Sequence, residues 1–277
     1  MNYYNIFREC FPDISITDEM FIQLSGIEQS TVFTHNISGE TVGFAMVNDN
    51  CIRLLCVAER YRNQGIGQKL MNMAEEHIKS KGYNEIILGG FSAGLFIGVP
   101  VSKDDWDRHS SPYFEKLGYS ASNGCAEMEM NITAFCADRY HLPVPENAEF
   151  DWYKGSPEEL TAAVSAVDEE WVQYFTDCDV FCGFIDGEIA SFCIVGNNEP
   201  CIISDGMGKV GAVGCVGTVP KFRRKGIGLK MVALATEELK KQGYKKCFIH
   251  FTGVFDWYAK LGYKTVLWEW FGRKKLD

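Results

Sequence analysis

The chain has 277 residues and a formal net charge of −10, with 46% hydrophobic and 23% charged residues. This balance is typical of a globular protein with a buried core and excludes an intrinsically disordered chain. The negative charge argues against a nucleic-acid partner, because phosphate backbones are held by clustered Lys and Arg, and it suits a cationic or amine substrate better. The sequence has no stretch of about 18 uninterrupted apolar residues, so we expect no membrane association.

The 11 cysteines are scattered and odd in number, and the first ten residues lack the apolar run of a signal peptide. Both features favour reduced thiols in a cytoplasmic protein over a disulfide framework. The sequence has no C-x-x-C pair and no Cys/His cluster with zinc spacing. We therefore expect no metal.

The first half of the chain contains a strand, a glycine-rich turn and a helix in succession. Ser38 and Gly39 predict a hairpin after a short opening helix, and residues 52–57 predict the next strand. The turn R-N-Q-G-I-G follows at residues 62–67. A helix is then predicted, ending near Gly82 in a left-handed conformation. Its apolar stripe consists of Ile66, Leu70, Met73, Ala74 and Ile78.

Beyond this helix the first half continues as alternating strands and loops. Residues 85–88 predict a strand, and residues 89–106 predict a long loop of the kind that lines binding sites. The motif F-E-K-L-G-Y follows at residues 114–119, and residues 126–132 predict a closing strand. Prolines at 143 and 145 then mark a join between two domains.

The second half repeats the same order of elements. Asp186 and Gly187 predict the hairpin, residues 197–211 a surface loop, and residues 213–219 the strand. The turn F-R-R-K-G-I-G and its helix match the first copy at one constant offset. The apolar stripe of this second helix consists of Ile227, Met231, Leu234, Ala235 and Leu239.

The second helix ends at Gly243, a strand is predicted at residues 246–251, and Y-A-K-L-G-Y follows at residues 258–263. We refer to the two copies as the first repeat and the second repeat. They predict two mixed α/β domains, at residues 1–140 and 147–277.

The repeated turn has the chemistry of an anion site. A glycine turn before a helix leaves the first backbone N–H groups of that helix unpaired, and glycine lets a bulky anion approach them. With the helix dipole they favour a pyrophosphate, and nearby cations reinforce it. Neither copy has the Lys-Ser/Thr of a P-loop or a G-x-G-x-x-G fingerprint. The alternative for a single such turn is a helix start with exposed basic residues, but two matched copies favour the anion site.

The repeated motifs resemble those of a known family. An R-x-x-G-x-G turn between an apolar strand and a helix, followed by Gly-Tyr, a strand and Y-x-x-x-G-Y, resembles the GCN5-related N-acetyltransferase (GNAT) family. The two repeats together resemble a tandem GNAT protein. This resemblance implies two tandem domains, each with a mainly antiparallel central sheet flanked by helices. It also implies acetyl-CoA as acyl donor, with its pyrophosphate on the turn and its pantetheine beside the preceding strand.

The resemblance also implies roles for individual residues. The proton donor to the departing thiolate maps onto Tyr258, whereas the same place in the first repeat holds Phe114, which has no proton to give. Tyr113 is adjacent but is expected to point about 100° away on a helix. Tyr258 as a core aromatic is the alternative. The expected cofactor-binding residues are Val216, Gly217, Thr218, Arg223, Arg224, Lys225, Gly226, Ile227 and Gly228 in the second repeat, and Leu55, Val57, Arg62, Gly65 and Gly67 in the first.

The general base is left open by the sequence. His250 is a candidate base or proton relay at neutral pH, although a lone His in an apolar strand is often a satisfied core residue. Asp256 and Glu269 are further candidates, and a water chain is another. We expect the second repeat to catalyse and the first to be degenerate or regulatory.

These features favour an N-acyltransferase that moves acetyl from acetyl-CoA to a primary amine of a small molecule by direct attack in a ternary complex. A non-catalytic acyl-CoA-binding or sensing protein and a protein N-acetyltransferase are the alternatives. The oligomeric state and the acceptor are left open.

Overall fold

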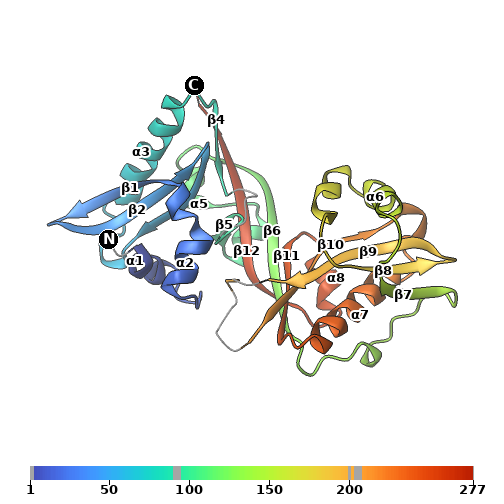
Figure 1. Cartoon of the computed structure of the whole chain (residues 1–277). Helices are drawn as coiled ribbons and strands as arrows, with labels where there is room; N and C mark the ends of the chain where they lie inside the picture. The colour runs from blue at the N-terminus through green and yellow to red at the C-terminus, as the bar shows by residue number, and fades with distance from the viewer. Residues whose placement is uncertain (1–2, 90–94, 199–200, 203–207, 277) are drawn as a thin grey trace. The chain divides into compact units, whose positions relative to one another are not determined.

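The computed structural model describes residues 3–89, 95–198, 201–202 and 208–276 (Figure 1). The helices are α1 (Tyr3–Cys10), α2 (Asp18–Ser25), α3 (Ile66–Ser80), α4 (Lys103–Asp107), α5 (Pro112–Glu115), α6 (Pro157–Ser165), α7 (Ile227–Lys241) and α8 (Phe255–Ala259). The strands are β1 (Thr31–Ile37), β2 (Glu40–Asn48), β3 (Cys51–Val57), β4 (Glu85–Leu88), β5 (Val99–Val101), β6 (Ser120–Asn131), β7 (Ala148–Trp152), β8 (Val180–Ile185), β9 (Glu188–Asn197), β10 (Val210–Thr218), β11 (Lys246–Thr252) and β12 (Lys264–Lys275). Short 3-10 turns lie at Ile27–Gln29, Glu59–Tyr61, Ala137–Arg139, Glu169–Phe175 and Pro220–Phe222.

The local signals in the sequence predicted these elements well. Both hairpins turn through left-handed residues at the predicted sites, with φ of 51° and 83° at Ser38 and Gly39. The two long helices begin inside the predicted turns, and Gly82 and Gly243 beyond their ends have φ of 87° and 91°. The predicted loop at 89–106 contains β5 in its described part. Residues 90–94 of that loop, and 199–200 and 203–207 of the loop predicted at 197–211, lie outside the described residues.

One position of the predicted stripe on α3 is wrong. The side chain of Met73 is 41% exposed, and Met71 is fully buried in its place. The face of α3 that packs on the sheet is centred on Ile66 and on the residues four and eight positions after it. Met71 lies beside this row, on the side where Ile86 and Trp270 belong to the same core. On α7, the predicted Leu234 is only partly buried against the core.

The chain divides into two compact units that do not coincide with the two repeats. Residues Met1–Ala126 and Leu267–Asp277, with Cys201 and Ile202, belong to the first unit. Residues Glu127–Glu199 and Gly206–Val266 belong to the second unit. The predicted domains at 1–140 and 147–277 follow the order of the sequence, whereas the compact units follow the packing.

In the first unit the strands run in the order β1-β2-β3-β4-β12-β6. Neighbouring residues of β2 face opposite layers, because side chains alternate along a strand. Ala45 packs with Leu70 of α3, whereas the ring of Phe44 lies 4.9 Å from the ring of Tyr3 on α1. The sheet of this unit is therefore covered by α3 on one face and by α1 on the other (Figure 1).

In the second unit the strands run in the order β6-β11-β10-β9-β8-β7. Cys193 on β9 packs with the core beneath α7, and its neighbour Phe192 packs with Leu160 and Val164 of α6. This sheet thus also has a helix layer on each face. In each unit the sheet is mostly antiparallel, and the strand before the glycine turn pairs in parallel with the strand after its helix, β3 with β4 and β10 with β11.

Two long strands exchange between the repeats, and we call β6 and β12 the exchanged strands (Figure 1). Residues 127–131 of β6 belong to the first repeat but lie in the second unit. Residues 267–275 of β12 belong to the second repeat but lie in the first unit, where Gly272 pairs with Leu88 and Lys275 with Glu85. Each unit is therefore completed by a strand from the other repeat.

Across the described ranges, none of the helices is both long enough and apolar enough to cross a membrane.

Candidate active site

The two predicted turns have the same backbone conformation. Asn63 and Arg224 occupy equivalent positions and have φ of 59° and 63°. Gly65 and Gly226, two residues later, have φ of 78° and 81° and form the N-caps of α3 and α7. Left-handed backbone of this kind is accessible to glycine without the strain that a Cβ causes. The repeat is therefore one of geometry as well as of sequence.

Each turn leaves backbone donors at a helix start. The first bonds within the helices run from Lys69 N to Gly65 O, at 3.1 Å, and from Lys230 N to Gly226 O, at 3.2 Å. The N-cap glycines provide no side-chain hydrogen bond. The first N–H groups of both helices therefore have no acceptor in their own helix, as an anion site at a helix N-terminus requires.

The two turn arginines brace the turns on the preceding strands. Arg62 Nε donates to Val57 O at 3.0 Å, and Arg223 Nε donates to Thr218 O at 3.1 Å. Arg62 Nη2 also donates to Glu9 O at 3.1 Å. We expect these arginines to contact a pyrophosphate. They also have a structural role, because the same side chains fix the path of the chain into the helix.

The strand before each turn separates from the strand that follows its helix. In the first unit β3 and β4 pair in parallel only at Cys51 with Ile87 and at Ile52 with Leu88. In the second unit β10 and β11 pair in parallel only up to Ala212 with Phe248. The remaining residues of β3 and β10, which include the predicted Leu55 and Val216, face an opening between the two strands.

The opening of the first unit contains a cavity of about 250 Å³. Leu54, Leu55 and Leu88 line it from the strands, and Tyr113 and Phe114 line it from α5. Tyr113 was expected to point away from Phe114, yet both line the cavity. A Cβ added to Gly67 would lie 2.6 Å from Tyr113 Oη, so this hydroxyl sits at the start of α3. The cavity is predominantly apolar, and Tyr113 connects its lining with the start of α3.

The opening of the second unit has a bulged strand and a buried tyrosine. β10 is irregular between Gly214 and Gly217, where Cys215 has φ of 46°. Tyr258 on α8 is 5% exposed, and burial raises its pKa, with the neighbouring Cys193, Cys247 and Cys215 adding to the effect. Because those cysteines lie on β9, β11 and β10, the phenol group lies at the point where β10 and β11 separate. A raised pKa keeps the phenol proton in place at neutral pH.

His250 lies on the other face of the same opening. Cys247 and Ile249 of β11 pack in the core with α7 and Tyr258. Side chains alternate along a strand, so His250 points to the opposite face. It follows Phe248, the last residue of β11 that pairs with β10. The structure thus brings the two predicted catalytic residues to one opening, from opposite faces.

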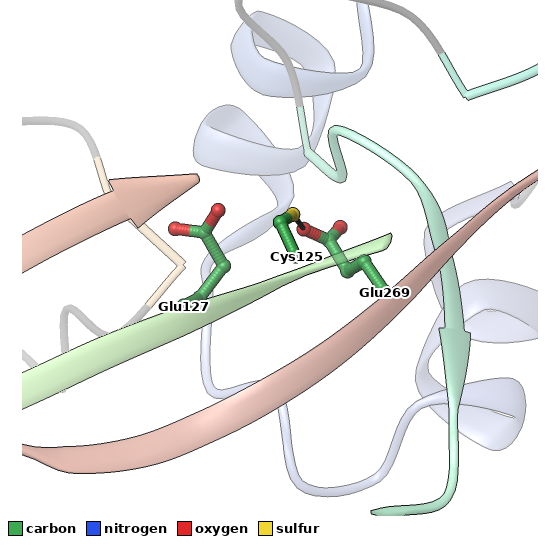
Figure 2. Close-up of side chains that lie close together, drawn as sticks. All are labelled: Cys125, Glu127 and Glu269. Atoms are coloured by element: carbon green, nitrogen blue, oxygen red, sulfur yellow. Dashed lines mark hydrogen bonds between the residues drawn. The ribbon is translucent and has the colours of Figure 1, made fainter. Parts of the chain in front are cut away.

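Figure 2 shows Glu269, a further candidate base, together with Cys125 and Glu127, whose side chains lie close to it. It belongs to the first unit, is fully buried, and its Oε1 accepts hydrogen bonds from Ile97 N and Gly98 N, both at 3.0 Å. Its Oε2 accepts a hydrogen bond from Cys125 Sγ at 3.5 Å. This carboxylate therefore anchors the backbone at residues 97 and 98.

The linker between the repeats contacts the second turn. A Cβ on Gly226 would lie 2.2 Å from Pro143 O, whereas a Cβ on Gly65 would meet nothing within 4 Å. A wider cavity of about 440 Å³ in the second unit is lined by Trp152, Tyr153 and Asp179 among others, and by no residue of the turn or of β11. The two turns are therefore equal in conformation but differ in their surroundings.

Sequence reasoning missed Glu127, which hydrogen-bonds to His250. The alternation of Glu127 and Glu129 with Met128 and Met130 predicts a half-buried strand, but it does not separate the buried glutamate from the more exposed one. Only the pairing of β6 with β11 makes that distinction.

The fold and the paired turns define a tandem acyltransferase-like protein. The model of the Acetyltransferase (GNAT) family matches residues 1–94 and 146–263. The chain belongs to this family and is a tandem GNAT protein. The search of curated proteins finds no match.

Solved structures share this fold. The glucosamine N-acetyltransferase region of a fungal multi-domain GH3 β-N-acetylglucosaminidase is similar with a TM-score of 0.74 and 24% identity, over 98% of this chain and 36% of that one. This chain thus spans about a third of the length of that matched chain. A GCN5-related N-acetyltransferase from Sphaerobacter thermophilus has a TM-score of 0.67 and 16% identity, over 99% and 91% of the two chains. A tandem GNAT protein from the clavulanic acid biosynthesis pathway has a TM-score of 0.61 and 12% identity, over 99% and 94%.

Proposed function

We propose that this chain is an acetyl-CoA-dependent N-acetyltransferase that acts on a primary amine of a small molecule, with the chemistry in the second unit. One observation carries the proposal: Tyr258 and His250 lie on opposite faces of the opening between β10 and β11. An amine that attacks a thioester must lose a proton on one side, and the departing thiolate must gain one on the other.

Different residues of the second unit bind the donor and transfer protons in the proposed reaction. The N–H groups at the start of α7 hold the pyrophosphate, and Val216, Gly217 and Thr218 of β10 offer backbone contacts for pantetheine and the developing oxyanion. As the nitrogen–carbon bond forms and the carbon–sulfur bond breaks, His250 accepts the proton of the amine. Tyr258 gives its proton to the leaving sulfur, and its raised pKa keeps that proton on the phenol at neutral pH until the carbon–sulfur bond breaks.

The first unit supports a second function, non-catalytic binding of an acyl-CoA. Its turn is open at Gly65, and its cavity of about 250 Å³ lies between β3 and β4, where the pantetheine is expected. Phe114 takes the place of Tyr258 and has no acidic proton. We propose that this unit binds the donor or an analogue of it without turning it over.

The first prediction tests the role of Tyr258. Replacing Tyr258 with Phe removes the proton and leaves the ring, so we expect the turnover number to fall by about 100-fold or more while acetyl-CoA binding is kept. The measurement is thiol release from acetyl-CoA. Tyr244→Phe is the matched control, because Tyr244 lies beside Gly211 at the paired end of β10, away from the opening. Equal turnover of the two variants would remove Tyr258 from the mechanism.

The acceptor panel for this assay follows from the alternatives. Glucosamine belongs in it because the fungal region is described as a glucosamine N-acetyltransferase. Peptides with a free N-terminus or a lysine test the protein N-acetyltransferase alternative.

Calorimetric titration with coenzyme A assigns the binding sites. The variants Gly67→Asp and Gly228→Asp each place a negative charge at one of the two turns, so each should weaken binding at that turn. Binding without thiol release from any acceptor would favour a sensor.

A further inference from the structure

Glu127 is an almost fully buried carboxylate in the second unit, and its side chain is 3% exposed. Its two oxygens have different partners. Oε2 lies 2.8 Å from His250 Nδ1, and Oε1 accepts a hydrogen bond from Phe251 N at 2.9 Å. Phe251 has φ of 51°, a left-handed conformation that is rare for an aromatic residue. Glu127 thus holds both the ring of His250 and the unusual backbone that follows it.

The ring of His250 is held on one side and accessible on the other. Its side chain is 44% exposed, its Nε2 lies 3.1 Å from Asn198 Oδ1, and Phe248 packs edge-on against it at 4.3 Å. The buried edge therefore faces the carboxylate. The accessible edge carries Nε2 and faces Asn198.

When Glu127 is ionised, its contact with Nδ1 places the proton of the neutral ring on that nitrogen. An ionised carboxylate only accepts, so Nδ1 carries a proton and Nε2 is left with a lone pair. Asn198 suits both states of Nε2. Its Oδ1 accepts from a protonated Nε2, and the same amide turned over donates from Nδ2 to an unprotonated one. The ring can therefore gain and lose a proton at Nε2 while Nδ1 stays fixed by Glu127.

We propose that Glu127 is a positioning residue for the acyl transfer, which fixes the Nδ1–H tautomer of His250 so that Nε2 takes the proton of the amine. This inference rests on the proposed function of the second unit. Glu127 itself belongs to the first repeat, on the part of β6 that lies in the second unit. The active site of the second unit is therefore built by both repeats.

A purely structural role for Glu127 is the competing explanation, since a buried carboxylate needs donors and His250 is one. The two explanations differ in what they say of the ring. A structural role requires only that the carboxylate be paired, whereas a positioning role requires that the tautomer of His250 follow the carboxylate.

The test compares Glu127→Gln with Glu129→Gln in the full chain. Glu129 lies on the same face of β6, and its contact is an ion pair with Lys246 at 3.6 Å, so it controls for the loss of a glutamate from this strand. Nitrogen-15 NMR of the histidine rings reports the tautomer, and thiol release with the best amine of the panel reports turnover. We expect Glu127→Gln to shift His250 toward the Nε2–H tautomer and to lower kcat by about tenfold or more, with KM for acetyl-CoA kept. Glu129→Gln should change neither.

A second variant keeps the test decisive if the first is unstable. Glu127→Asp retains the negative charge on a shorter side chain, and we expect it to restore the Nδ1–H tautomer in part and kcat with it. An unchanged tautomer in Glu127→Gln, or a tautomer that changes without any change in kcat, would overturn the proposal. If the wild-type chain shows no acetyl transfer to any amine, the proposed function fails, but the NMR comparison still decides whether Glu127 sets the tautomer.

Discussion

Cys10 shows how a single side chain takes on an unusual chemical state from its contacts. Its Sγ accepts a hydrogen bond from Arg62 Nη2 at 3.4 Å and lies 3.5 Å from Val57 O. A hydrogen bond with the Cys56 thiol, more than the nearby Arg62, lowers the pKa of Cys10 to about 6, while burial raises the pKa of Cys56. The arginine that braces the first turn therefore also stabilises a thiolate.

We predict from this pKa that Cys10 reacts with iodoacetamide as a thiolate at neutral pH. The alkylation rate should rise with pH, reach half of its maximum near pH 6, and level off at pH 7, because the thiolate is the nucleophile. Cys178 provides an internal reference, since burial raises its pKa and its rate should still be rising above pH 9. Mass spectrometry of alkylated peptides gives both rates.

Replacing Arg62 with Gln should move the Cys10 midpoint to higher pH, because the positive charge and one donor are lost. A Cys10 rate that stays low up to pH 8 in the wild-type chain would contradict the prediction. So would a midpoint that does not respond to Arg62→Gln.

The two glycine turns show how surrounding residues change the cost of the same substitution. Gly65 and Gly226 have almost the same φ, so an alanine meets the same backbone strain at either position, about 1 kcal/mol. At Gly226 the new Cβ would also collide with Pro143 O in the linker, which is backbone and yields only if the linker moves. Equal strain and unequal surroundings make the pair a matched comparison.

We therefore expect Gly226→Ala to lower the free energy of unfolding by about 1–3 kcal/mol more than Gly65→Ala does. Thermal and urea unfolding followed by circular dichroism measure both values. Equal losses would mean that the linker does not rest on the second turn. Equal losses would also remove the main difference in the surroundings of the two turns.

Much of the fold could be predicted from sequence because its signals are local. The turns, the helices that follow them and both hairpins were predicted, since glycine placement and apolar periodicity act within a few residues. Tyr258 and His250 were candidates by motif and by chemistry, and their catalytic roles stay predictions. Met71 could not be chosen over Met73, because both border the apolar row and the sheet decides between them.

The rest depends on contacts between distant segments. Glu127 could not be assigned to His250, because the two are far apart in sequence and are joined only by the pairing of β6 with β11. The backbone donors of Glu269 could not be predicted either, because residues 97 and 98 are far from it in sequence. The exchange of β6 and β12 between the units has no signal in the hydrophobic pattern, since either partner strand satisfies the same alternation.

At the scale of the whole molecule, the exchanged strands make each repeat incomplete by itself. We predict that a chain of residues 1–140 does not fold, because β4 would lose its pairing with residues 272–275 of β12. A chain of residues 147–277 would lack residues 127–131 of β6, and with them Glu127. Circular dichroism and size-exclusion chromatography should show disordered or aggregated material for both.

The packing also indicates a chain that should fold where residues 1–140 do not. Ser120 Oγ donates to Arg273 O and Ser122 Oγ to Phe271 O, so β6 and β12 run antiparallel in the first unit and residues 126 and 267 face each other. Joining residues 1–126 to 267–277 through a two-residue Asn-Gly turn should therefore give a monomer with a cooperative unfolding transition. A folded, monomeric product from residues 1–140 would contradict this account of the exchange.

The exchange of strands also sets an order for biosynthesis. A ribosome makes the chain from its N-terminus, and N-terminal domains usually fold first as they emerge. Here the first unit lacks residues 267–275 until residues 127–266 have also been made. The second unit needs only residues 127–266 and can be completed earlier. The second unit should therefore fold before the first, with the open edge of β4 exposed to chaperones until residues 272–275 have been made.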